Sequence, residues 1–300
     1  MPTNNSGIPV RPNLDKAREF ILGNARLLDR TRFAFLFEYG ATKDVVAALR
    51  PYQNVDGGFG NALEPDMRCA ASQPVSTEHA LEILDELGEL HPEIVHRCCD
   101  WLSAVTTHEG GVPFVLASVE EGPHAPWWKA TGEASLNPTA GIAGLLQKHA
   151  VKHPWVTVAT EYCWRRIEGG ELDRVGPDDA ISILRFLEWT PERERASATF
   201  DVLAEIIRLK LVAYDPQSAG YVKTPLDFAT APDRMAYRLF DSDTITAHLD
   251  ALAQRQQADG GWPISWDPPS PAAIGEWRAF ITIKWLVVLD RYGRLRETEA

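Results

Sequence analysis

Double-glycine turns recur along the chain and constrain its fold more than any other feature of the sequence. Four are intact, at 56–59 (DGGF), 109–112 (EGGV), 168–171 (EGGE) and 259–262 (DGGW), and a weaker one is at 218–221 (SAGY). Their spacing gives a loose period of about fifty residues, close to that of the longest repeats built from pairs of helices. A chain with such a period is expected to fold as a series of similar units, each packed on the next.

Between these turns the sequence has the periodicity of helices. Apolar residues keep helical spacing over 80–90, with Ser76 or Thr77 as the N-cap and Gly88 at the end. Proline in a first helical turn costs no hydrogen bond, so X-Pro pairs mark further helix starts. These starts lie at 91–92, 137–138, 153–154, 176–177 and 190–191, the last opening a helix to about 211, and two more helices are expected over 244–257 and 276–291.

The predicted helices are of two kinds. Those beginning near 140 and 276 are small or apolar on nearly all sides, which is typical of a helix buried all round, whereas 191–211 has a charged face. An inner ring of buried helices inside an outer, half-solvated ring satisfies both patterns. The sequence therefore predicts an all-α fold, an (α/α) toroid or barrel of about five to six hairpins, with an open solenoid as the alternative. We expect one such domain over 14–293, a flexible segment at 1–13 and a tail at 294–300.

Composition restricts the partners and the location. Acidic residues number 42 against 30 basic ones, a formal net charge of −12, which argues against nucleic acid. The segment 1–13 has no apolar signal region, and the longest apolar stretch, 280–289, is interrupted by Lys284 and too short for a transmembrane span. The four cysteines show no CxxC and are expected to be buried and reduced. These observations predict a cytoplasmic protein.

Two of the turns carry a family resemblance. At 53–60 (QNVDGGFG) and 256–262 (QQADGGW) the sequence resembles the repeat of the squalene–hopene cyclase and protein prenyltransferase superfamily. In that repeat a Gln at a helix end ties the turn to an adjoining helix, glycines make the turn, and an aromatic residue packs into the neighbouring unit. We interpret Asp56 and Asp259 as turn formers. The resemblance implies an α/α toroid that holds an isoprenoid in an apolar central cavity.

The resemblance also directs attention to acidic residues at helix starts. Class II cyclases of this superfamily protonate an alkene or epoxide with the middle Asp of an Asp-x-Asp-Asp motif. The nearest match, 241–244 (DSDT), makes Asp243 the candidate proton donor and Asp241 its hydrogen-bonding partner. Asp178 and Asp179 form a second partial match. Helix capping is the competing interpretation, because a helix N-terminus stabilises a charged Asp.

A loop near the first turn is richer in polar groups than packing requires. Its charged side chains are expected to converge at one mouth of the barrel as an acid/base or recognition cluster, or else to form an exposed, salt-bridged loop. The candidates are Glu64, Asp66, Arg68, Glu78 and His79.

Tryptophans are the remaining candidates for substrate contact, because their π faces can stabilise a cation. Trp127 and Trp128 lie in one suggestive loop, Trp262 follows the last turn, and Trp266 lies in the Pro-rich run 263–271, a candidate lid.

No cofactor is expected. The Asp-x-Cys and distant His that bind zinc in the prenyltransferase branch are missing, and so is the Asp-rich magnesium motif of class I cyclases.

Three functions stay open. An enzyme that cyclises an isoprenoid after protonation is the leading hypothesis. The second is a polysaccharide lyase or glycosidase-like toroid, because 256–263 is similar to a pectate lyase sequence, although Ile264 replaces the Lys found there. The third is a non-catalytic toroid that binds a ligand or protein, as the complement thioester domains do. Their Cys-Gly-Glu-Gln sequence is absent.

Overall fold

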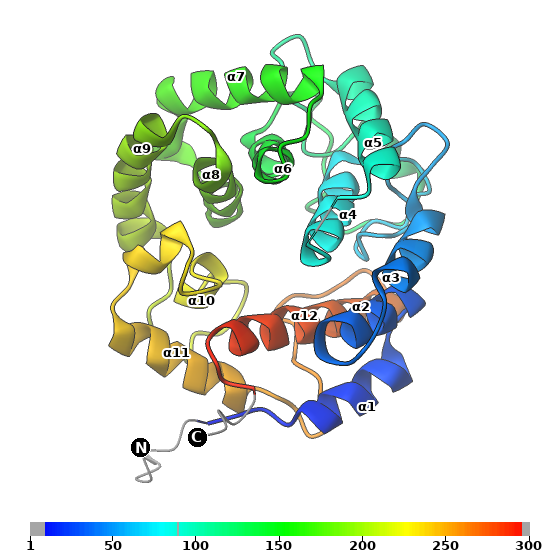
Figure 1. Cartoon of the computed structure of the whole chain (residues 1–300), viewed down its shortest axis with the longest axis vertical. Coiled ribbons are helices and arrows are strands. Elements are labelled where there is room, and N and C mark those ends of the chain that lie inside the picture. The colour runs from blue at the N-terminus through cyan, green and yellow to red at the C-terminus, as the bar shows by residue number, and fades with distance from the viewer. Residues whose placement is uncertain (1–9, 89, 296–300) are drawn as a thin grey trace.

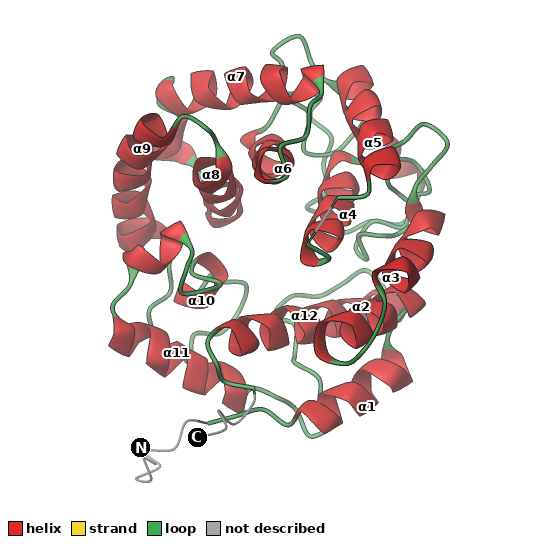
Figure 2. Ribbon diagram, in the orientation of Figure 1, coloured by secondary structure: helices red, strands yellow, loops and turns green. Residues whose placement is uncertain are grey.

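Twelve α-helices joined by loops make up the computed structural model, which describes residues 10–88 and 90–295 (Figure 2). They are α1 (Leu14–Asn24), α2 (Leu27–Phe37), α3 (Thr42–Leu49), α4 (Pro74–Glu86), α5 (Pro92–Val105), α6 (Leu136–Lys148), α7 (Pro154–Glu168), α8 (Pro177–Trp189), α9 (Arg193–Ile206), α10 (Pro225–Phe228), α11 (Ser242–Gln254) and α12 (Pro271–Arg291). The described residues contain isolated β-bridges and no strand, so the all-α prediction is confirmed. Most of the predicted flexible segment and tail, 1–9 and 296–300, lie outside the described residues.

The predicted helix starts at proline hold for α5, α7 and α8, whereas two other predicted boundaries were wrong. Helix α4 begins at Pro74, so that Ser76 and Thr77 lie inside the helix, and α12 begins at Pro271. In both cases a proline occupies the first turn and starts the helix several residues before the apolar pattern becomes clear.

Alternate helices lie nearer the centre of the molecule (Figure 1). The set α2, α4, α6, α8, α10 and α12 lies inside, and the set α1, α3, α5, α7, α9 and α11 lies outside. Helix α6 packs between α4 and α8, and α12 packs against α1 and α2. The last helix of the chain thus contacts the first two.

Small residues on α6 allow its close approach to α8. A Cβ atom at Gly144 would lie 2.6 Å from the carbonyl oxygen of Arg185 on α8. Because real Cβ atoms do not approach a backbone oxygen so closely, any larger residue would push the two helices apart. The small-residue pattern that indicated an inner helix is therefore explained by this contact.

The first and last double-glycine turns have the same construction. Gly57 and Gly260 have φ angles of +100° and +92°, and a Cβ at either position would lie within 2.3 Å of a backbone oxygen. Asp56 accepts a hydrogen bond from the second glycine N–H at 3.0 Å, and Asp259 does so at 3.1 Å. The interpretation of both residues as turn formers is confirmed.

The glutamines act as expected in these two turns. The Nε2 atom of Gln53 donates to the carbonyl of Gly57 at 2.9 Å and to that of Ile94 on α5 at 3.2 Å. Gln256 donates to Gly260 at 2.9 Å and to Asn13, before α1, at 2.8 Å. Each glutamine therefore ties its turn to another part of the chain.

The remaining turns are less alike. At 109–112 the N–H of Val112 donates to Thr139 at 3.0 Å, as Phe59 and Trp262 donate to the threonines Thr77 and Thr282. By contrast, a Cβ atom at Gly170 or Gly220 would meet nothing within 4 Å. These two glycines lie in open space, so the turns at 168–171 and 218–221 do not join packed units in the same way.

Candidate functional site

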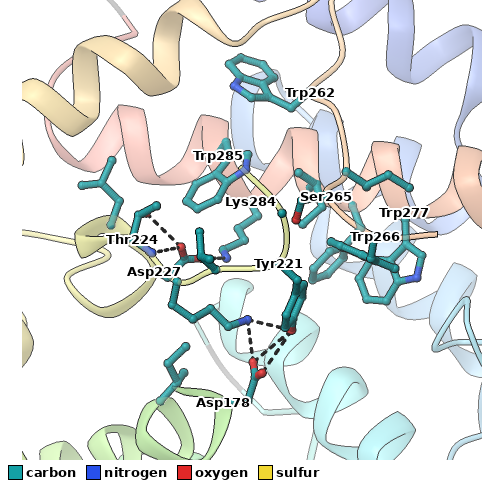
Figure 3. Close-up of a pocket in the computed structure, with 18 of the residues that line it drawn as sticks. Asp178, Tyr221, Thr224, Asp227, Trp262, Ser265, Trp266, Trp277, Lys284 and Trp285 are labelled. Atoms are coloured by element: carbon teal, nitrogen blue, oxygen red, sulfur yellow. Dashed lines mark hydrogen bonds and ion pairs between the residues drawn. The ribbon is translucent and has the colours of Figure 1, made fainter. Parts of the chain in front are cut away.

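A cavity of about 970 Å³ lies among the inner helices and is the candidate functional site. Side chains from α4, α6, α8 and α12 line it, together with the loops 216–224 and 262–266 (Figure 3). Its volume is at the upper end of the range found for small-molecule sites.

Nine of the thirteen residues predicted as site residues line this cavity. They are Glu64, Asp66, Glu78, His79, Asp178, Trp127, Trp128, Trp262 and Trp266. The loop after the first turn thus brings its side chains inward instead of exposing them.

The two residues assigned as proton donor and partner do not belong to the site. Asp241 and Asp243 are exposed at the start of α11, where Asp241 Oδ1 accepts a hydrogen bond from the N–H of Thr244 at 2.7 Å. Hydrogen bonds from the helix N-terminus lower the pKa of Asp241. A charged, solvated cap is a poor proton donor, so the capping interpretation replaces the catalytic one.

Two further candidates lie outside the cavity lining. Asp179 caps α8 by accepting a hydrogen bond from the N–H of Gly176 at 2.8 Å. Arg68 forms an ion pair with Glu276. Both side chains are therefore engaged in local structural contacts.

Glu64 and Asp66 form a buried acidic pair at the cavity wall, each only 2% exposed. Glu64 Oε1 accepts a hydrogen bond from the N–H of Asp66 at 3.2 Å. Asp66 Oδ2 accepts one from the indole of Trp266 at 3.1 Å, and Asp66 Oδ1 has no hydrogen-bond partner within the structure described. Burial raises the pKa of Glu64 well above its usual value, and the carboxyl group of Asp66 raises it further.

His79 faces this pair. Its Nδ1 atom lies 3.9 Å from Glu64 Oε2, and its ring meets the ring of Phe280 edge-on at 4.6 Å between centroids. Burial lowers the pKa of His79 to about 4, so the imidazole is neutral at neutral pH. Glu64 consequently has a neutral neighbour here instead of a cation that would favour its charged form.

Aromatic rings line the cavity beside the acidic pair. Trp266 and Trp277 are 5.0 Å apart between ring centroids, and Trp277 and Phe280 are 5.6 Å apart, both edge to face. No sequence pattern marks Trp277 as a site residue, because α12 is apolar on most sides and no periodicity separates a cavity-facing residue from a core residue.

Ion pairs form another part of the lining. Arg185 donates to Glu78 at 2.9 Å and also contacts Glu82. Lys223 lies 2.6 Å from Asp178, and the hydroxyl of Tyr221 donates to the same carboxylate at 3.2 Å. Figure 3 shows Tyr221 and Asp178 near a second pair.

That second pair joins Lys284 on α12 to Asp227 on α10 at 2.7 Å. Of the residues in these pairs, the sequence predicts only Glu78 and Asp178 as site residues. Their members lie between 43 and 107 residues apart, except that Tyr221 is two residues from Lys223. Only the packing of α4, α8, α10 and α12 brings them together.

The part of the chain that the structure describes contains no group of three or more His, Cys, Asp or Glu side chains arranged to hold a metal ion. The four cysteines are buried and form no disulfide. None of the described helices combines the length and apolarity needed to cross a bilayer.

Comparison with known proteins places the chain by its fold. No protein-family model and no curated protein sequence matches it. A crystal structure of a protein from Actinoplanes matches with a TM-score of 0.60 over 93% of this chain and 98% of that one, at 16% sequence identity. At this identity the likeness shows a shared all-helical fold and does not extend to function.

Proposed function

We propose that the chain is an α/α toroid of the terpenoid cyclase type, built from six helical hairpins. Three observations support this architecture: the alternation of inner and outer helices, the contact of α12 with α1 and α2, and the matching turns at 56–59 and 259–262. An open solenoid would leave its first and last helices apart.

We further propose that the cavity binds an isoprenoid and that the protein begins its cyclisation by protonation. Glu64 is the proton donor, and Asp66 is the neighbour that keeps it protonated. The observation that carries this proposal is a buried carboxyl group with a raised pKa, set among Trp266, Trp277 and Phe280. A neutral acid near physiological pH is what general acid catalysis requires.

The chemistry follows from these neighbours. Glu64 transfers its proton to a carbon of the substrate double bond, which leaves a carboxylate on Glu64 and a carbocation on the substrate. The π faces of the surrounding aromatic rings stabilise the cation while the ring closes. Loss of a proton from the product cation to the Glu64 carboxylate restores the acid, so that the cycle balances.

Product analysis tests this proposal. The protein is incubated with farnesol, geranylgeraniol and squalene, and products are identified by gas chromatography with mass spectrometry. We expect cyclised products from the wild type, their loss in Glu64→Gln, and their retention in Asp243→Asn and in Glu161→Gln, a matched change on the exposed face of α7. Unchanged yield in Glu64→Gln would refute the assignment of the donor.

Carbohydrate chemistry is the second candidate, favoured by the mixture of tryptophans and carboxyl groups in one cavity. Release of reducing ends or of unsaturated uronides from polysaccharides would support it. Tyr221 and Lys223 would be the residues expected to act as a lyase base. However, burial raises the pKa of Tyr221, which disfavours the phenolate that a base requires.

A further inference from the structure

The Lys and Arg side chains that line the cavity are already committed to partners. Within the described residues, six carboxyl side chains and four Lys or Arg side chains line it. They are Glu64, Asp66, Glu78, Glu82, Asp178 and Asp227 against Arg185, Lys223, Arg255 and Lys284. Acidic groups therefore outnumber the cations that an anionic ligand would need, even when Glu64, whose raised pKa keeps it protonated, is not counted.

Each of the four cations is held in place. Arg185, Lys223 and Lys284 form the ion pairs with Glu78, Asp178 and Asp227 described above. Arg255 donates to the backbone carbonyls of Pro216 at 2.6 Å and Ser218 at 3.3 Å.

The first of these pairs, Arg185 with Glu78, is also fixed by close packing against Gly141. A Cβ atom at Gly141 on α6 would lie 1.9 Å from Glu78 Oε1 and 3.1 Å from an Arg185 nitrogen. The ion pair thus occupies the volume that a side chain at this position would fill. Its geometry is part of the packing of α4, α6 and α8, so Arg185 cannot turn to a ligand without disturbing that packing.

A prenyl diphosphate would be a poor ligand for such a cavity. Its phosphates carry several negative charges and would have to displace carboxylates or backbone carbonyls from the cations, or bring metal ions. The hydroxyl group of a prenyl alcohol requires neither such displacement nor a metal ion. It can accept a hydrogen bond from Tyr221 or Lys223 and donate one to Asp178.

We propose that the ligand of this cavity is an uncharged isoprenoid, such as a prenyl alcohol, and not a prenyl diphosphate. This inference rests on the proposed isoprenoid binding and names the chemical class of the substrate. It concerns binding alone, so it stands or falls separately from the protonation chemistry.

Binding measurements on the full chain test the inference. Farnesol and farnesyl diphosphate are compared by thermal shift and by isothermal titration calorimetry, with and without MgCl₂. We expect farnesol to bind at least about tenfold more tightly in both conditions. Equal or tighter binding of the diphosphate in either condition would overturn the inference while supporting isoprenoid binding.

The two remaining outcomes are also informative. Binding of farnesol without any cyclised product supports the inference and counts against the proposed protonation. Binding of neither compound overturns both the inference and the isoprenoid proposal.

A charge-releasing variant adds a gain-of-function test. Asp178→Asn removes the carboxylate that holds Lys223, and Asp178 is sufficiently exposed, at 46% of its side chain, for the change to be tolerated. We expect the Kd for farnesyl diphosphate to fall about tenfold and the Kd for farnesol not to fall, because the alcohol carries no charge for the released Lys223 to attract.

Asp250→Asn is the matched control. It releases Arg294, whose Nη1 atom lies 2.8 Å from Asp250, at a place outside the cavity lining. We expect no change in diphosphate affinity there. Equal effects of the two variants would show that the carboxylates of the cavity do not exclude the diphosphate.

Discussion

At the scale of single residues, environment separates two sets of acidic side chains that look alike in the sequence. Asp241 lies at an exposed helix start, where hydrogen bonds lower its pKa, whereas Glu64 lies buried beside Asp66 and its pKa is raised. Both sets were candidates because acidic residues near a helix start or a loop suggest acid chemistry. Burial, which depends on residues such as Trp266 and Phe280 far along the chain, decided between them.

The raised pKa of Glu64 predicts a pH-dependent stability. In the folded state Glu64 keeps its proton over a range in which the unfolded chain has lost it, so its contribution is full below about pH 4.3 and is lost as pH rises through the folded-state pKa. Glu64→Gln removes the titrating carboxyl group, and with it this loss of stability at higher pH. We expect the melting temperature of Glu64→Gln, relative to wild type, to increase as pH rises from about 4.3 toward the folded-state pKa, as measured by differential scanning calorimetry.

The exposed change Glu161→Gln serves as the control for this titration, because its environment in the folded state is solvent. A constant difference between Glu64→Gln and wild type across the range would mean that Glu64 titrates normally in the folded state.

At the scale of elements, the double-glycine turns explain why the helices join as they do. Gly57 and Gly260 both need a positive φ, and both lie against a backbone oxygen of another element. Glycine is required there for two separable reasons, conformation and space. The turn at 168–171 contains the same Gly-Gly dipeptide, but a Cβ atom at Gly170 would meet nothing within 4 Å. The dipeptide alone therefore predicts a more regular fold than the structure has.

Three alanine substitutions separate these two reasons. Gly275→Ala, inside α12 with nothing within 4 Å, is expected to stabilise the protein by up to about 1 kcal/mol. Gly132→Ala, at φ +74° in open space, is expected to cost about 1 kcal/mol. Gly260→Ala adds a Cβ 2.1 Å from the Lys16 carbonyl oxygen and should cost clearly more. Urea denaturation measures all three, and equal costs at 132 and 260 would contradict the role of the close contact.

At the scale of the whole molecule, a single side chain joins the residue before α1 to the last double-glycine turn, in addition to the packing between helices. Gln256 accepts a hydrogen bond from the Asn13 N–H at 2.7 Å and donates to the Asn13 carbonyl at 2.8 Å. Together with the packing of α1 on α12, this bridge connects the first helix to the last turn.

Removing this bridge should loosen the junction. We expect Gln256→Ala to lower the free energy of unfolding by about 1–3 kcal/mol, because it leaves backbone groups without their partner. Hydrogen exchange should become faster in α1 and around 256–262. Gln53→Ala removes the matching side chain of the first turn, and its faster exchange should appear in α5 instead. Similar exchange changes in α1 for both variants would contradict a local junction.

The sequence by itself determined the all-helical fold, the helix starts at proline of α5, α7 and α8, the two matching turns and the glutamine ties. These features depend on residues close together in the chain, through periodicity, proline at helix starts and glycine at positive φ. Only the tertiary structure decided which acidic residues face the cavity, that Asp178 pairs with Lys223 and Glu78 with Arg185, and that Trp277 joins the site. Burial and charge pairing act between side chains that are distant in sequence, and no local pattern records them.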